Sequence, residues 1–198
     1  MKNGAVDDSG VDDSATANEW DGYAAGWDDD PAVRAYADAA FASLTALLAG
    51  AEPSLDGARV IDFGCGTGRL TEHLLAAGAA VHAIDTSPAM LRVLSEKADR
   101  WGWKDLHCSD SLPERGAGFD LVACASVCAF LDDYPGTVAE LASRLGPGGM
   151  FVQWDWERTG GDDHGLARTE IHAALTAAGL ADVSVGTAFT VEVEGQAM

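Results

Sequence analysis

Residues 58–68 read ARVIDFGCGTG, an apolar run that closes on Asp62 and three glycines at every second position. The run 58–64 is short and apolar, which is the pattern of a buried strand. Residues 69–77 have helical spacing, so the glycines fall in the turn between a strand and a helix. Such a turn lets the backbone approach a ligand and places a helix N-terminus beside it. The stretch therefore predicts a site for a small polar or anionic ligand.

Apolar runs and helical segments alternate along the rest of the chain. Further strands are predicted at 80–85, 105–110, 119–125 and 149–156. Helices are predicted to begin at Pro31, Pro88, Tyr134 and near Ile171. The helix from Tyr134 is expected to run through Leu145 and to end at Gly146. Because the strands are apolar throughout, the sequence predicts a doubly wound α/β fold with a mostly parallel sheet, whose ligands bind at the carboxyl ends of the strands.

The 198 residues are enough for one domain with a sizeable core. Residues 1–18 are polar, acidic and aperiodic, so we expect a disordered acidic tail, followed by a single domain over 19–198. The aromatic stretch EWDGYAAGWDD at 19–29 is expected to pack on that domain. Residues 182–195 form a β-rich stretch, or two joined near Gly186.

The charge balance excludes several partners. Twelve lysines and arginines stand against 32 aspartates and glutamates, a formal charge of −20. Nucleic-acid binding normally needs a basic face, so neither a nucleic acid nor an anionic membrane is expected as a partner. Four cysteines occur without a CxxC pair, and we interpret them as free thiols and not as a metal site. With no apolar run after Met1, we expect a cytoplasmic protein without a signal peptide or a membrane span.

Two glycine patterns compete for the ligand. A dinucleotide site has G-x-G-x-x-G, with a third glycine for close packing under a pyrophosphate. Gly64, Gly66 and Gly68 are instead spaced G-x-G-x-G, and Arg69 stands where the dinucleotide pattern has its third glycine. The spacing argues against a nicotinamide-dependent oxidoreductase, which stays as the less favoured alternative.

The stretch VIDFGCGTGRL resembles the first motif of the class I S-adenosylmethionine-dependent methyltransferases. HAIDTSPAML, HCSDSLP, FDLVACASVCAFLDD and LASRLGPGGMFVQWDWE resemble the motifs that follow, in the family's order, from about residue 58 to 157. The resemblance implies a Rossmann-like, seven-stranded type of sheet and S-adenosyl-L-methionine as cofactor. The family usually ends in a long antiparallel hairpin, so the last strand is either residues 189–194 or missing from this sequence. A missing strand leaves an open edge, and both a monomer and a homodimer stay open.

The resemblance implies roles for individual residues around the cofactor. Asp85 is expected to accept hydrogen bonds from the ribose hydroxyls, although a carboxylate at a strand end can also cap the next helix. Asp110 is matched to the acceptor for the adenine amine, and Ser111 to the backbone beside the ring. The other expected contacts are Asp62, Gly64, Cys65, Gly66, Gly68, Thr86, Met90, Ser126, Tyr23 and Trp27. Met90 has helical spacing with Leu94 and is equally expected in the core.

The methyl acceptor is expected above the cofactor, among the segments that follow the fourth and fifth strands. This lining is aromatic and mildly acidic, which favours a small, partly apolar molecule. Its expected members are Cys128, Phe130, Leu131, Tyr134, Trp154, Asp155, Trp156, Glu157 and His164, with Tyr23 and Trp27 above. Candidate acceptor-side catalytic groups are Asp155, Glu157, His164 and Tyr23. A binding module with the same cofactor and no catalysis is the main alternative to a small-molecule methyltransferase.

Overall fold

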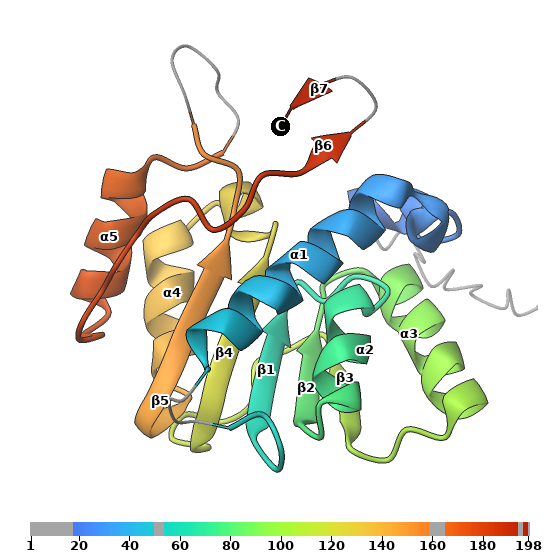
Figure 1. The fold of residues 1–198 in the computed structure, drawn as a ribbon. Helices are drawn as coiled ribbons and strands as arrows, with labels where there is room; N and C mark the ends of the chain where they lie inside the picture. Colours follow the sequence, from blue (N-terminus) through green and yellow to red (C-terminus); the bar gives the residue numbers. More distant parts are fainter. Residues whose placement is uncertain (1–17, 50–53, 159–164, 194–195, 198) are drawn as a thin grey trace, which may run out of the picture.

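The computed structural model of the chain describes residues 18–49, 54–158, 165–193 and 196–197 (Figure 1). Five parallel strands form one sheet in the order β3-β2-β1-β4-β5. The strands are β1 (Arg59–Phe63), β2 (Ala80–Ile84), β3 (Leu106–Ser109), β4 (Phe119–Ala125) and β5 (Leu145–Trp154). The α-helices are α1 (Pro31–Leu47), α2 (Arg69–Ala76), α3 (Pro88–Trp101), α4 (Tyr134–Ala142) and α5 (Arg168–Ala177). The predicted doubly wound α/β fold is therefore confirmed.

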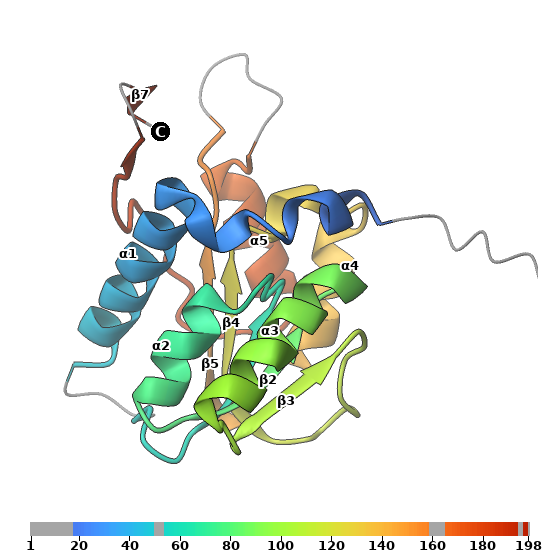
Figure 2. The ribbon, with the colours of Figure 1, turned by 90° about the vertical axis from the view of Figure 1, so that its right-hand side faces the viewer.

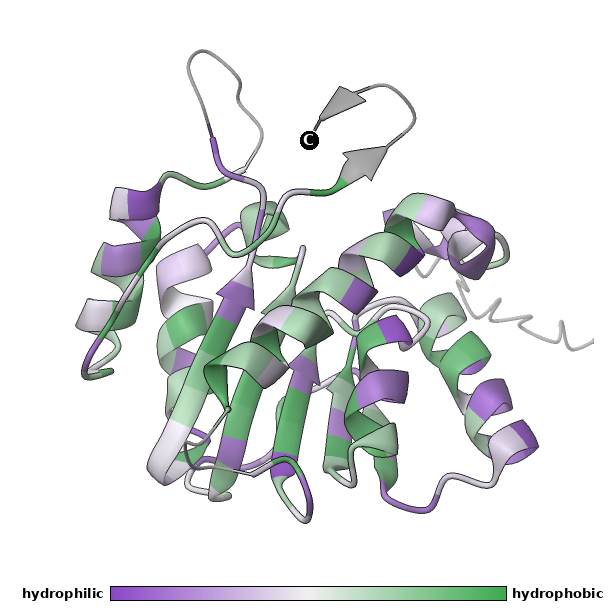
Figure 3. Cartoon of the chain, viewed as in Figure 1, coloured by the Kyte–Doolittle hydropathy of each residue, from purple (hydrophilic) through white to green (hydrophobic). Residues whose placement is uncertain are grey.

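Helices α1, α2 and α3 cover one face of the sheet, and α4 and α5 cover the other (Figures 1 and 2). On the first face Leu44 and Leu74 share one apolar cluster with Val60 of β1. On the second, Val138 and Leu141 of α4 share another cluster with Val122 of β4. Figure 3 shows the strands as mostly hydrophobic and the outer sides of the helices as more hydrophilic. Burial on both faces explains why the strands are continuous apolar runs.

The helix starts form as the sequence predicts. The Asp30 carboxylate accepts a hydrogen bond from the backbone N–H of Ala32 at 2.8 Å, and Pro31 occupies the first turn of α1. The Ser87 hydroxyl accepts from the backbone N–H of Met90 at 3.2 Å, ahead of Pro88 in α3. A capping side chain followed by proline fixes each helix start.

Two predictions about the later elements are wrong. Helix α4 ends at Ala142, and Leu145 is instead the first residue of β5, where it pairs with Phe119. Leu145 packs on the same apolar cluster as Leu141, so its hydrophobic spacing does not distinguish a helix from a strand.

The second wrong prediction concerns the β-rich stretch at 182–195. Its described part contains only β6 (Glu192–Val193), which pairs with β7 (Gln196–Ala197) and not with the parallel sheet. Within the described ranges the sheet therefore has five strands, consistent with a shortened sheet.

The aromatic stretch at 19–29 packs on the domain as expected. It forms two 3-10 helices, η1 (Glu19–Tyr23) and η2 (Trp27–Asp29), which contact α3 and α1. Figures 1 and 2 place this N-terminal segment above the carboxyl ends of the strands. The predicted tail, except for Asn18, and His164 lie outside the described residues. None of the described helices has the length and apolar character needed to cross a membrane.

Candidate functional site

A cavity of about 390 Å³ lies at the carboxyl ends of the central strands and is lined in part by the N-terminal segment. Small-molecule sites commonly enclose roughly 300–1,000 Å³, so its size fits one small ligand. Ten of the predicted cofactor contacts line it: Asp62, Gly64, Cys65, Gly66, Asp85, Thr86, Met90, Asp110, Ser126 and Trp27. Gly68, Ser111 and Tyr23 are not among its described lining residues.

The glycine loop is tightly bound to its own surroundings. The backbone N–H groups of Gly64 and Cys65 both donate to the Ile84 carbonyl, at 2.8 and 2.9 Å. The N–H of Gly68 donates to the Cys65 carbonyl at 2.8 Å. Gly64 has a φ of 71°, and a Cβ there would lie 2.4 Å from the Val127 side chain. The loop is therefore rigid and closely packed, which suits a preorganised binding site.

Asp62 lies beneath the loop, with 1% of its surface exposed. Its carboxylate accepts a hydrogen bond from the Thr71 hydroxyl on α2. Burial raises the pKa of Asp62 from 3.8 to about 6, although the bonds from Thr71 lower it and the nearby Asp85 raises it further. Asp62 thus ties β1 to the first turns of α2, and so holds both ends of the glycine loop.

Asp85 stands at the end of β2 and faces both the loop and the cavity. One carboxylate oxygen accepts from the backbone N–H of Gly66 and the other from that of Ser87, each at 2.8 Å. Burial raises the pKa of Asp85, while the backbone N–H donors lower it. An ionised carboxylate has about four acceptor positions, so two remain for hydroxyl groups of a ligand. The capping role and the proposed ligand role are therefore compatible.

The remaining polar and apolar contacts of this half of the cavity come from strand ends and α3. Met90 is 2% exposed and lines the cavity, so it is both a core residue and part of the wall. Asp110 and Thr86 also line it. The backbone N–H of Ser111 donates to the Ser109 hydroxyl, which fixes the turn after β3.

An aromatic roof closes the cavity from the N-terminal segment and from the loop after β4. It consists of Trp20, Trp27 and Phe130, whose rings meet edge to face at 6.2 Å (Trp20 to Trp27) and 5.1 Å (Trp20 to Phe130). Trp27 lies so close over the loop that a Cβ on Gly66 would be 3.4 Å from its Nε1. Tyr23 contacts both tryptophans from outside and is 60% exposed.

The roof is fastened to the start of α3. The Asp21 carboxylate accepts from the Ser87 hydroxyl at 2.5 Å and from the Ala89 backbone N–H at 3.2 Å. The hydrogen bond from Ser87 is the main reason that the pKa of Asp21 is lowered. The Asn18 amide donates to the Thr86 hydroxyl at 3.1 Å. The N-terminal segment is therefore part of the site and bonds to residues next to Asp85.

The other half of the cavity is lined by α1 and by the segments after β4 and β5. The Trp156 indole N–H donates to the Ser126 hydroxyl at 3.1 Å, and Ser126 has a φ of 55°. The Tyr36 ring lies 5.3 Å from the rings of Trp156 and Phe189, measured between centroids. Burial, reinforced by the negative charge of Asp155, raises the pKa of Tyr36, so its hydroxyl stays protonated.

The predicted acceptor-side groups are not brought together. Asp155 lies behind the described lining, where its carboxylate accepts from the Ala129 backbone N–H at 3.2 Å and from the Gln153 amide at 2.9 Å. Burial raises its pKa from 3.8 to about 6. The Glu157 carboxylate pairs with the Arg168 guanidinium through two bonds of 2.7 Å on the surface.

Of the other predicted acceptor-side residues, Phe130, Leu131 and Trp156 line the cavity. Cys128, Tyr134 and Trp154 lie in the buried core and are not among the described lining residues.

Sequence reasoning misses several lining residues, of which Trp20, Tyr36 and Arg69 are the most polar or aromatic. Tyr36 has the spacing of a core position in its helix, and nothing local distinguishes it from its apolar neighbours. Trp20 belongs to the segment 19–29, which is predicted to pack on the domain, but the sequence does not show that Trp20 faces the cavity. Arg69 is noticed only as the residue that replaces a glycine.

The residues present fit a cofactor with an adenosine and an amino acid. The cavity joins Asp85 and Asp110, at adjacent strand ends, to an apolar wall at Met90 and an aromatic roof. Arg69 brings a guanidinium to the same cavity, and its Nε is buried without a hydrogen-bond partner in the described structure. The two aspartates can thus accept hydrogen bonds from hydroxyl and amine groups of a ligand, and Arg69 can pair with a carboxylate.

Comparisons with known proteins agree with this fit. Residues 61–151 match the family described as "Methyltransferase domain". The ubiquinone biosynthesis O-methyltransferase of Xylella fastidiosa strain M23 is 38% identical over 104 residues, which cover 50% of this chain and 42% of the relative. The enzyme of the same name from Xanthomonas axonopodis pv. citri is 31% identical over 150 residues, which cover 74% of this chain and 59% of the relative.

A solved S-adenosylmethionine-dependent methyltransferase from Aquifex aeolicus has the same fold. Its TM-score is 0.62 at 24% identity, with 83% of this chain and 88% of that chain covered. Residues 61–151 thus resemble a methyltransferase domain in sequence, and the fold is that of a solved methyltransferase. The chain spans less than two thirds of the length of either curated relative named above.

Proposed function

We propose that the protein binds S-adenosyl-L-methionine in the cavity and transfers its methyl group to a small, partly apolar acceptor. The observation that carries this proposal is the joining of the rigid glycine loop, Asp85 and an aromatic roof around one cavity. The match of residues 61–151 to the methyltransferase domain family and the names of the two relatives support it. A nicotinamide cofactor is disfavoured because Arg69 stands where a pyrophosphate loop has glycine.

The chain's residues would hold the cofactor by parts. Asp85 would accept from the ribose hydroxyls with the acceptor positions that Gly66 and Ser87 leave free. Asp110 and the turn at Ser111 would meet the adenine, with Met90 as its apolar wall. The bound cofactor would supply a methyl group on a sulfonium, which leaves readily. Alignment and exclusion of water by Trp20 and Trp27 are then the main contributions of the protein.

The acceptor would occupy the half of the cavity lined by Tyr36, Ser126 and Trp156. The aromatic lining supports a small, partly planar molecule, and the relatives' printed name, an O-methyltransferase, supports an oxygen acceptor. Asp155, which lies behind this lining, would act on the acceptor side through its charge on Tyr36, since its pKa of about 6 leaves it ionised at neutral pH. General-base help is needed only for an acceptor that must lose a proton.

Titration calorimetry with S-adenosylmethionine and S-adenosylhomocysteine tests the proposal. We expect one site per chain for both compounds, and a loss of binding in Asp85→Ala. Asp99→Ala, which removes an exposed carboxylate from α3, is the matched control and should bind as the wild type does. Absence of binding of either compound to the folded wild-type protein would contradict the proposal.

Transfer of a labelled methyl group separates an enzyme from a binding module. We expect label in at least one acceptor from a panel of phenols, carboxylic acids, amines and thiols of one or two rings. A protein that binds the cofactor tightly but labels none of the panel would be a non-catalytic module. A fluorescence titration with NADH should show no binding.

We further propose that residues 19–198 work as one domain in the cytoplasm, as a monomer or a homodimer, without nucleic-acid or membrane partners. The docking of the N-terminal segment on α1 and α3 supports a single unit. All four cysteines are free, which suits a reducing compartment. Sedimentation velocity of the purified protein would determine the oligomeric state.

A further inference from the structure

Arg69 is the one cationic side chain among the described residues that line the cavity. Three aspartates, Asp62, Asp85 and Asp110, share that lining. Because three carboxylates and one guanidinium line the cavity, it favours positively charged groups and disfavours a carboxylate everywhere except near Arg69. An amino-acid ligand carries a carboxylate, so the position of Arg69 decides where its acid end can lie.

The glycine loop has few backbone donors left for such a carboxylate. The N–H groups of Gly64 and Cys65 are used by the Ile84 carbonyl, and that of Gly68 by the Cys65 carbonyl. The N–H of Gly66 is used by the Asp85 carboxylate. These four amides therefore bond within the protein, and a cationic side chain beside the loop can supply charge for a bound carboxylate.

The Arg69 side chain has donor capacity to spare. One terminal nitrogen pairs with the Glu72 carboxylate at 3.2 Å, and the side chain is 24% exposed. Its Nε is buried and has no hydrogen-bond partner in the described structure. A guanidinium has five N–H donors in a planar fork that matches a carboxylate. Because Nε has almost no accessible surface, the donors that a ligand could meet are those of the terminal nitrogens that Glu72 leaves free.

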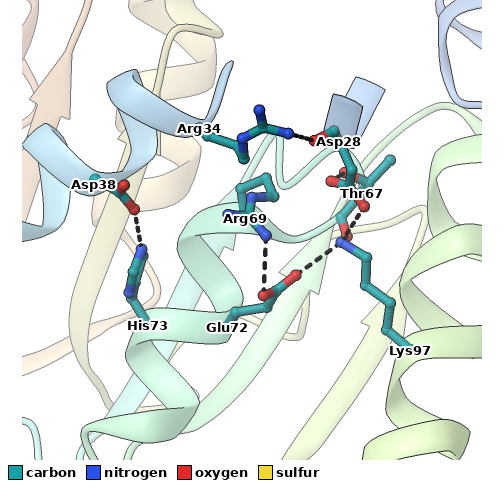
Figure 4. A network of polar contacts seen from close by, with 8 residues as sticks. All are labelled: Asp28, Arg34, Asp38, Thr67, Arg69, Glu72, His73 and Lys97. Carbon is teal, nitrogen blue, oxygen red and sulfur yellow. Dashed lines mark hydrogen bonds and ion pairs between the residues drawn. The ribbon is translucent and has the colours of Figure 1, made fainter. Parts of the chain in front are cut away.

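A network of charges holds Arg69 in place (Figure 4). Glu72 gives its second oxygen to the Lys97 ammonium at 2.8 Å. Lys97 also pairs with Asp28 at 2.6 Å and donates to the Thr67 carbonyl at 2.9 Å. Because Lys97 partly neutralises Glu72, that carboxylate does not consume the whole charge of Arg69. The same network fastens the N-terminal segment beside the guanidinium.

We propose that Arg69 binds the carboxylate of the cofactor's amino-acid end. This assignment rests on the proposed function, because it presupposes S-adenosylmethionine or S-adenosylhomocysteine in the cavity. The residue that breaks the dinucleotide pattern would then be the one that selects an amino-acid cofactor. Glu72 and Lys97 act as positioning residues, since they hold the guanidinium without lining the cavity themselves.

A comparison of two ligands on two proteins tests this assignment. The ligands are S-adenosylhomocysteine and its decarboxylated analogue, which has a hydrogen in place of the carboxylate and is otherwise identical. The proteins are the wild type and Arg69→Met, measured by titration calorimetry. We expect the wild type to prefer S-adenosylhomocysteine by about ten- to hundredfold, the range of a charge-assisted hydrogen bond. Arg69→Met should lose that preference and bind the analogue as the wild type does.

The outcomes separate this inference from the proposed function. If the folded wild type binds neither ligand, the proposed function itself fails. If the wild type binds both equally, or if Arg69→Met keeps the preference, the assignment of Arg69 is overturned while the cofactor site stands. If Arg69→Met weakens both ligands by the same factor, Arg69 has only a structural role. Arg100→Met removes an exposed arginine from α3 and should keep the wild-type preference.

Discussion

Gly68 begins helix α2 in a conformation that other residues rarely adopt, with a φ of 91°. A Cβ at this position would lie 2.3 Å from Cδ1 of the fully buried Leu94. Gly68→Ala should therefore lower the free energy of unfolding by about 2 to 4 kcal/mol, from backbone strain and overpacking together. Denaturant unfolding of the purified variant measures this change.

Gly102 provides the control for Gly68. It ends α3 with a φ of 69°, and a Cβ there would meet nothing within 4 Å. Gly102→Ala should cost only the backbone strain, about 1 kcal/mol. Equal losses in the two variants would show that contact with Leu94 contributes nothing at Gly68.

Asp155 predicts a specific dependence of stability on pH. Its pKa in the folded protein is about 6, above the ordinary value of 3.8, so the folded state binds the proton more tightly than the unfolded chain. The contribution of Asp155 to stability therefore falls as pH rises from about 4 to 6, by on the order of 3 kcal/mol. Asp155→Asn removes this titration.

The measurement is the stability of Asp155→Asn relative to the wild type at several pH values. The free energy of unfolding of the wild type should rise relative to that of the variant as pH falls from 7 to 4. Only the wild type has a buried negative charge at residue 155 that protonation removes. A difference that stays constant between pH 7 and 4 would mean that Asp155 titrates as an exposed aspartate does.

At the scale of residues, the sequence predicts the parts of the site that are local. The glycines, Asp62 and Asp85 belong to strand ends whose turns the sequence marks directly. Tyr36 and Arg69 are not predictable in this way. Tyr36 reaches the cavity only because α1 packs across the ends of the strands, and the free donor of Arg69 appears only once Glu72 and Lys97 are placed.

The N-terminal segment is held as one element by Lys97. The Lys97 ammonium contacts Asp28 of η2, Glu72 of α2 and the Thr67 carbonyl of the glycine loop, and the side chain is 13% exposed. Lys97→Met would leave the partly buried Asp28 carboxylate without its cation and Glu72 with Arg69 alone, at a cost of about 1 to 3 kcal/mol. We expect the segment 18–29 to detach before the rest of the domain unfolds.

Hydrogen exchange of the peptide that contains residues 19–29 measures this detachment. Its protection should fall in Lys97→Met, while the peptides of β1 and β4 keep theirs. Lys104→Met, which removes an exposed lysine near the amino ends of the strands, should leave every peptide unchanged. Unchanged exchange at 19–29 in Lys97→Met would show that the aromatic contacts and the hydrogen bonds of Asp21 and Asn18 hold the segment without Lys97.

At the scale of elements, the strands and most helix starts are predictable because capping residues and buried runs are local signals. The boundary between α4 and β5 is not predictable, because Leu145 could pack on the same apolar cluster as a helix residue or as a strand residue. The β-rich residues 182–191 lie in no strand, since β propensity does not specify a pairing partner.

The whole molecule brings residues from distant parts of the chain to one end of a parallel sheet. Ligand binding there should therefore stabilise the entire fold. At a concentration of S-adenosylhomocysteine about a hundredfold above its dissociation constant, the gain is about 2.7 kcal/mol. For a domain of this size the unfolding temperature should rise by roughly 5 to 10 °C. Thermal unfolding followed by circular dichroism measures the shift, and NAD at the same concentration should cause none.

The central claim is that the cavity between the glycine loop and the aromatic roof holds the methyl donor. A crystal structure of the protein grown with S-adenosylhomocysteine tests it most directly. We predict the ligand in this cavity, with its ribose hydroxyls on Asp85, its adenine beside Asp110 and its carboxylate on Arg69. A structure with the ligand bound elsewhere, or with the cavity empty at saturating ligand, would contradict the account.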